Sequence, residues 1–133
     1  GATLAVLAAA DTVVCVGGAD PVALQRLVRA IAELREALPG CAPLVVVNRV
    51  RRGVIPGEPE REIAAALSRY AGITGLTYLP DDGAAVDAAL AVGRTLAEVA
   101  PGSQLRQGIA AFARRLVDRP EPQRQRRWRR AAG

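Results

Sequence analysis

The chain has 133 residues, of which 50% are hydrophobic, so it is long enough and apolar enough for one domain with a packed core. All 18 basic residues are arginine, and lysine, histidine and methionine are absent. These absences exclude a phosphate-loop lysine, a Schiff-base lysine, a histidine general base and a histidine metal site within this chain. Because it begins without a methionine, we expect it to be a fragment or a processed product.

The net charge of +5 is confined to the end of the chain. Residues 1–118 carry twelve arginines and twelve acidic residues, whereas residues 119–133 carry six arginines and one glutamate. Cys15 and Cys41 are too few and too far apart in sequence for a metal cluster or a secreted disulfide framework, and we expect Cys15 to be an inert core residue. No signal peptide is recognisable, so the sequence predicts a cytoplasmic protein.

The first half of the chain has the pattern of a strand–helix–strand unit. A helical stretch of small residues at 2–10 precedes a predicted strand at 12–16 and a glycine turn at 17–20. Asp20 is placed to cap the next helix, Pro21 suits its first turn, and apolar residues then recur on one face up to about Leu38.

The organising stretch of the sequence is LVVVNRV at 44–50. A run of four apolar residues, three of them β-branched, predicts a strand buried on both faces, as in a parallel sheet covered by helices. Asn48 and Arg49 follow this run directly and therefore stand at the carboxyl end of the strand. In open α/β sheets that end borders the ligand crevice, so the two residues are the first functional candidates.

The second half repeats the alternation of helix and strand. A helix over 61–71 is expected to end at Gly72, and LTYLP at 76–80 predicts a third strand. Asp82 is placed to cap a helix that runs through Val86, Ala89 and Leu90 and ends at Gly93. Ser103 is placed to cap a last helix, in which Leu105, Ile109, Phe112 and Leu116 recur at spacings of four, three and four. The predicted fold class is α/β with three layers, a parallel sheet of about three strands covered by helices.

Three stretches together resemble a known family: ADTVVCVGGADPVAL, LVVVNRV, and the segment from YLPDDGAAV to the end of the last helix. They are similar to the second half of the nucleotide-binding domain of MinD/ParA-type ATPases, including the CpaE-like and septum-site proteins, within the deviant Walker A branch of P-loop NTPases. The resemblance covers residues 1 to about 118. Its markers are the strand-terminal Asn48–Arg49 pair and the Pro-x-Asp-x-x-x-Val of Pro80, Asp82 and Val86.

The resemblance implies an adenine pocket at the carboxyl ends of two strands. In the family the strand-terminal asparagine hydrogen-bonds the base, which falls on Asn48, and the loop after the last strand closes over it, here Leu79, Pro80, Asp81 and Asp82. An amide suits this task because it offers both a donor and an acceptor. Taken without the family, Asn48 would simply end the strand and tie down the next loop. For Arg49 two roles stay open, packing against the base or pairing with Asp81 or Asp82.

The chain departs from the family because it has no phosphate loop and no magnesium- or water-positioning aspartates at the expected places. The glycines at 17–18 lack the length and the lysine of a phosphate loop, and Asp11 and Asp20 are better explained as a strand-entry residue and a helix cap. ATP with magnesium is therefore expected in the complete protein, with no tight binding and no catalysis by this chain alone.

The main functional hypothesis is the base-binding half of an ATPase that positions a septum, chromosome or pilus apparatus. Its partner would be the missing amino-terminal half of the domain, and the hypothesis leaves a homodimer open. The rival hypothesis is a non-catalytic, ATPase-like adaptor that binds partner proteins.

The segment 119–133 predicts a disordered basic tail, because it is polar, broken by prolines and rich in arginine. Three interpretations stay open: a solvated terminus without a partner, an anionic membrane surface at the inner leaflet, or DNA in the nucleoid. The residues that would bind an anionic surface are Arg124, Arg126, Arg127, Trp128, Arg129 and Arg130.

If the tail binds an anionic surface, binding to anionic vesicles or DNA should fall steeply with salt and disappear on truncation after Asp118. Co-sedimentation with vesicles and a gel-shift assay with DNA measure this. Trp128→Ala separates the two surfaces, since a loss confined to vesicles favours membrane and a loss confined to single strands favours base stacking. Equal binding by the truncated chain would place the surface elsewhere.

Overall fold

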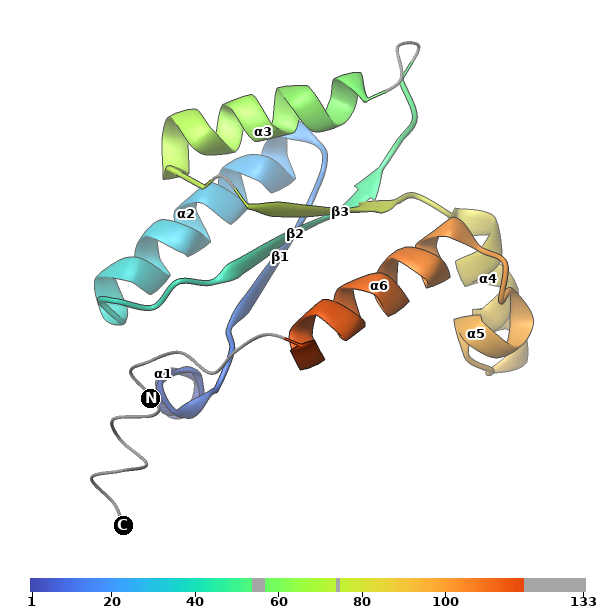
Figure 1. Ribbon diagram of the computed structural model, residues 1–133, viewed down its shortest axis with the longest axis horizontal. Helices are drawn as coiled ribbons and strands as arrows, with labels where there is room; N and C mark the ends of the chain where they lie inside the picture. Colours follow the sequence, from blue (N-terminus) through green and yellow to red (C-terminus); the bar gives the residue numbers. More distant parts are fainter. Residues whose placement is uncertain (54–56, 74, 119–133) are drawn as a thin grey trace.

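A computed structural model describes residues 1–53, 57–73 and 75–118 of the chain. In chain order its elements are α1 (Ala2–Ala9), β1 (Val14–Gly18), α2 (Pro21–Ala37), β2 (Leu44–Val50), α3 (Glu58–Ala71), β3 (Leu76–Pro80), α4 (Gly83–Val92), α5 (Leu96–Val99) and α6 (Gln104–Asp118). Helices and strands alternate from α1 to α4, and two more helices, α5 and α6, follow (Figure 1). None of the helices in these ranges is both long enough and apolar enough to cross a bilayer.

The three strands form one parallel sheet in the order β1-β2-β3, as the fold-class prediction requires. The central strand β2 pairs Leu44 with Val14 on one side and Val45 with Leu76 on the other. Its residues Val45, Val46 and Val47 are all buried, because helices cover both faces of the sheet at this strand. The continuous apolar run in the sequence therefore reports burial on two faces rather than one.

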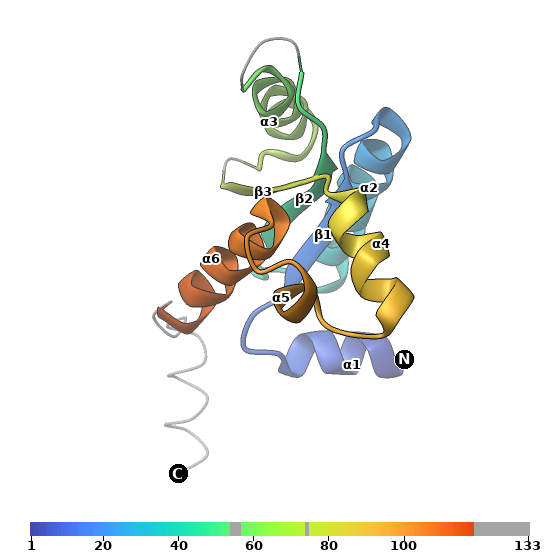
Figure 2. The same cartoon turned by 90° about the vertical axis from the view of Figure 1, so that its right-hand side faces the viewer.

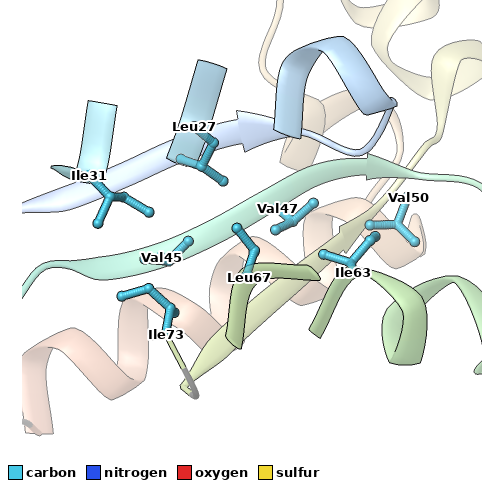
Figure 3. Close-up of a cluster of buried hydrophobic side chains, with 8 residues drawn as sticks. All are labelled: Leu27, Ile31, Val45, Val47, Val50, Ile63, Leu67 and Ile73. Carbon is cyan, nitrogen blue, oxygen red and sulfur yellow. The ribbon is translucent and has the colours of Figure 1, made fainter. Parts of the chain in front are cut away.

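The helices α2 and α3 cover one face of the sheet (Figure 1). Their inward residues meet alternate residues of β2, and Figure 3 shows Leu27 and Ile31 of α2 and Leu67 of α3 around Val45 and Val47. Two long-range hydrogen bonds fix the position of α3. A guanidinium N–H of Arg35 in α2 donates to the carbonyl of Ala71, and the hydroxyl of Tyr78 in β3 donates to the carbonyl of Glu60 at 3.1 Å.

The helix α6 covers the other face, where Leu105 packs with Val46 and Leu79. At Gly108 the helix comes so close to β3 that an added Cβ would lie 3.1 Å from Leu79 Cδ2. The short helices α4 and α5 lie beside the carboxyl end of the sheet and add Val86 and Leu96 to this second cluster (Figures 1 and 2). Over β1 the second face is poorly covered, and Val16 is 62% exposed.

Several boundaries differ from the sequence prediction. The strand predicted at 12–16 runs from Val14 to Gly18, so the two glycines belong to β1 and not to a loop. The helix predicted from residue 61 begins at Glu58, where Pro59 is accommodated in the first turn, which needs no backbone donor. The helix α5 was not predicted, although Thr95 and Glu98 form a capping box at its start.

The apolar residues of the helices α4 and α6 are only partly buried. Leu90 of α4 is 74% exposed and Ile109 of α6 is 46% exposed. Both helices lie at the margin of the sheet, where α6 covers mainly β3, so each buries a narrower stripe than its apolar spacing suggests.

The close contact between β1 and α2 explains the first of the two glycines. A Cβ at Gly17 would lie 2.8 Å from Leu27 Cδ2 and 2.9 Å from Leu27 Cβ, both within van der Waals overlap. Because Leu27 is itself buried in the first cluster, α2 would have to move away from the sheet to make room.

We expect Gly17→Ala to lower the free energy of unfolding by about 1–3 kcal/mol through this overlap. The matched control is Gly102→Ala, since nothing lies within 4 Å of a Cβ at Gly102. Urea unfolding followed by circular dichroism measures both variants. Equal stabilities of the two variants would show that α2 adjusts to the extra methyl group without cost.

Candidate functional site

A cavity of about 830 Å³ opens at the carboxyl ends of β1 and β2. It is bounded by Gly17 and Gly18 of β1, the start of α2, the residues 48–51 that end β2, and the first turns of α3. The position follows from the topology, because parallel strands end at one edge of the sheet and the next helices begin there. Two residues of the predicted adenine pocket, Asn48 and Arg49, contribute to its wall.

Asn48 is held in place by its own loop. Its Oδ1 accepts a hydrogen bond from the backbone N–H of Arg49 at 2.9 Å, and the residue is half-buried opposite Gly18 of β1. The side-chain nitrogen donates no hydrogen bond within the described ranges. The amide oxygen therefore ties down the following residue, as expected for a structural role, while the two N–H donors of the amide are available to a ligand.

Arg49 has an unusual backbone conformation for its residue type. Its φ is 61°, and it is the one residue other than glycine with a positive φ in the part of the chain described. The turn interrupts the alternation of the strand: the pairing register with β3 shifts between Val47 and Val50, and both valines lie in the first hydrophobic cluster. Its exposed side chain makes no hydrogen bond or ion pair with any described residue.

The four pocket residues predicted at the end of β3 and in the loop after it do not form the wall of this cavity. Leu79 packs beneath α6 with Val46, on the sheet face opposite α2 and α3. Pro80 pairs with Val50, and the backbone N–H of Asp81 donates to the carbonyl of Val50 at 3.0 Å. Backbone pairing and this hydrogen bond therefore hold the end of β3 against the end of β2.

The carboxylates of Asp81 and Asp82 have partners other than Arg49. Asp81 Oδ2 lies 3.4 Å from Nε of Arg51, an exposed ion pair. Asp82 caps α4 by accepting from the N–H of Ala85 at 3.3 Å, and its other oxygen accepts from the hydroxyl of Ser103 at 2.7 Å. Asp82 thus joins the start of α4 to the start of α6.

The structure brings three further charged residues to this edge that the sequence prediction did not select. Arg51 and Glu62 line the cavity, and Arg52 donates to Oε1 of Gln104 at 2.8 Å. The signal for the arginines was present in the sequence, since three of the four residues at 49–52 are arginine. Their different partners depend on contacts with β3 and α6.

Asp20 is a helix cap as predicted. Its Oδ1 accepts from the N–H of Ala23 at 2.9 Å, so the amino terminus of α2 already holds a carboxylate. Cys15 is a half-buried member of the first cluster, and burial, together with the nearby Cys41, raises the pKa of its thiol. Both observations agree with structural roles.

Within residues 1–53, 57–73 and 75–118 no group of three or more acidic, cysteine or histidine residues could hold a metal ion. The predicted anionic-surface residues, Arg124 to Arg130 with Trp128, lie outside the described residues. No protein-family model matches the chain, and no curated protein matches it in sequence.

Asp82→Ala should lower the free energy of unfolding by about 1–2 kcal/mol, because it removes the cap of α4 and the partner of Ser103 together. Asp87→Ala on the exposed side of the same helix is the control and should change stability by less than about 0.5 kcal/mol. Chemical unfolding of the two variants provides the comparison. Equal losses would mean that the link from α4 to α6 contributes nothing measurable.

Proposed function

We propose that the cavity at the carboxyl edge binds the base of an adenine nucleotide. The chain would then be the base-binding half of a MinD/ParA-like ATPase that positions a septum, chromosome or pilus apparatus. The observation that carries the proposal is the state of Asn48: its oxygen is tied to the N–H of Arg49, and its amide N–H groups have no acceptor in the described structure beside an 830 Å³ cavity.

The chemistry of adenine matches this arrangement. The base presents a ring-nitrogen acceptor, N7, beside an exocyclic amino donor. The N–H of Asn48 suits the acceptor, and its Oδ1 keeps a second lone pair for the amino group while it holds the Arg49 N–H. Because Oδ1 is already fixed, the amide does not need to be ordered when the base arrives, which lowers the cost of binding.

The described residues fit the base but not the magnesium ion. They contain no group of three acidic side chains that would hold it, and the whole chain has no lysine. We therefore assign base binding to this chain and derive no catalytic step from it. Hydrolysis of ATP would need residues contributed by a partner segment, which cradle the phosphates and orient water.

A second candidate function is the non-catalytic adaptor, favoured by the outer edge of β1. In the described part of the chain β1 pairs with β2 alone, and Val16 beside this edge is exposed. An unpaired edge of this kind can receive a strand from a partner protein. A complete gene product that neither binds nucleotide nor releases phosphate from ATP would favour the adaptor.

In the complete product of the coding sequence, Asn48→Asp should weaken ATP binding by about 5- to 150-fold, equivalent to about 1–3 kcal/mol. The carboxylate keeps an acceptor for the Arg49 N–H but removes the N–H donors that would meet the base. Isothermal titration calorimetry measures the affinity, and thermal unfolding verifies the fold.

Two controls accompany this variant. Adenosine, which has no phosphates, separates loss of base contacts from repulsion between the new carboxylate and the phosphates. Asn48→Ala removes the acceptor as well, so it should lose stability in addition to affinity. A folded Asn48→Asp protein with unchanged affinity for ATP and adenosine would refute the role in base binding.

A further inference from the structure

The backbone of Arg49 is in a conformation that its residue type disfavours. For an L-residue with a long side chain the left-handed region costs about 1–2 kcal/mol, and glycine or asparagine would fit a φ of 61° better. Such outliers persist where the surrounding structure enforces them, and they gather at ligand sites. Here the Asn48 hydrogen bond and the paired ends of β2 and β3 enforce it.

Of the two arginines that line the cavity, Arg49 is the one whose guanidinium is available to a ligand. Arg51, the other arginine in the wall, is paired with Asp81, and the carboxylate of Asp20 is engaged as the cap of α2. Arg49 is exposed and without a protein partner in the described structure. Glu62 is the remaining charged residue of the wall and the one that would compete for it.

We infer that Arg49 is a binding residue for a phosphate group that enters this cavity. The planar guanidinium can bind two phosphate oxygens at once, and its exposure lets it do so without first breaking an ion pair. The phosphate is either that of a nucleotide or a free diphosphate. The nucleotide case rests on the proposed function, whereas the free diphosphate does not.

The central test is Arg49→Gly in the 133-residue chain, because this substitution separates strain from binding. Glycine accepts the positive φ, so the melting temperature should stay the same or rise by a few degrees. Affinity for inorganic pyrophosphate at the cavity should fall about tenfold or more. The readout is the shift of the Asn48 and Gly18 amide signals in 15N-labelled protein as pyrophosphate is added.

The matched control is Arg52→Gly, which removes the same charge from the same loop at a residue that binds Gln104 and does not line the cavity. The arginines of 119–133 are the same in all variants, and pyrophosphate bound to them would shift the amide signals of those residues rather than those of Asn48 and Gly18. Arg49→Lys keeps the charge without the two-pronged geometry and should restore only part of the affinity. Glu62→Gln removes the competing carboxylate and should tighten pyrophosphate binding.

A lower affinity for pyrophosphate in Arg49→Gly, with unchanged affinity in Arg52→Gly, supports the inference. Equal losses in both variants, or no loss in Arg49→Gly, would overturn it. If Arg49→Gly does not fold, the pyrophosphate affinities of Glu62→Gln and Arg49→Lys provide the test. Unchanged affinity in both of these variants would refute the role of Arg49. Adenosine and ADP are titrated in parallel. If adenosine shifts the Asn48 and Gly18 amide signals and pyrophosphate does not, base binding is supported and the phosphate site at Arg49 is refuted. If pyrophosphate shifts these signals and adenosine does not, only the phosphate site is supported.

Discussion

The burial of β2 on both faces is the constraint on which the rest of this fold depends. Val45 and Val47 pack beneath α2 and α3, and Val46 packs beneath α6, so one strand supplies the centre of both hydrophobic clusters. Near its carboxyl end the strand leaves this apolar pattern at Asn48 and Arg49, which are half-buried and exposed, before it ends at the buried Val50. The polar residues that interrupt the buried run therefore line the candidate site.

The carboxyl edge is polar partly because the helices α2, α4 and α6 begin there with a polar side-chain cap. Asp20 caps α2, Asp82 caps α4, and Ser103 accepts from the N–H of Arg106 at the start of α6. Each aspartate places a carboxylate at the start of its helix and accepts from one N–H there, which disfavours an anionic ligand at these two helix ends. Near the end of β2, by contrast, the amide nitrogen of Asn48 and the guanidinium of Arg49 have no hydrogen-bond or ion-pair partner among the described residues.

The two edges of the sheet, at β3 and at β1, are covered to different extents by helices. At the β3 side, α6 approaches through Gly108, and the Asp82–Ser103 hydrogen bond holds α4 and α6 together. At the β1 side, α2 covers the first face through Gly17, but Val16 on the second face stays exposed. An exposed apolar edge without charged residues is prone to pair with another strand, and residues 12–18 contain no charge. The β1 side is therefore where an additional segment or partner would add most burial.

Local sequence determined most of the elements and several of the helix ends. Asp20, Asp82, Ser103, Gly72 and Gly93 were all predicted as helix boundaries, because a cap or a left-handed stop depends on hydrogen bonds within three or four residues. The apolar run of β2 likewise predicted burial on both faces. The position of Asn48 and Arg49 beside a cavity at the carboxyl edge also followed from sequence, since the carboxyl ends of parallel strands meet at one edge.

Only the tertiary structure decided which distant residues meet. The partner of Asp81 is Arg51 because the left-handed turn at Arg49 shifts the register of the residues that follow. Gly17 and Gly18 belong to β1 because a helix packs directly against them, a contact with Leu27 and Ala23 that no local pattern specifies. That the guanidinium of Arg49 has no partner among residues 1–53, 57–73 and 75–118 is likewise a result of the tertiary structure, since the carboxylates of Asp81 and Asp82 have other partners.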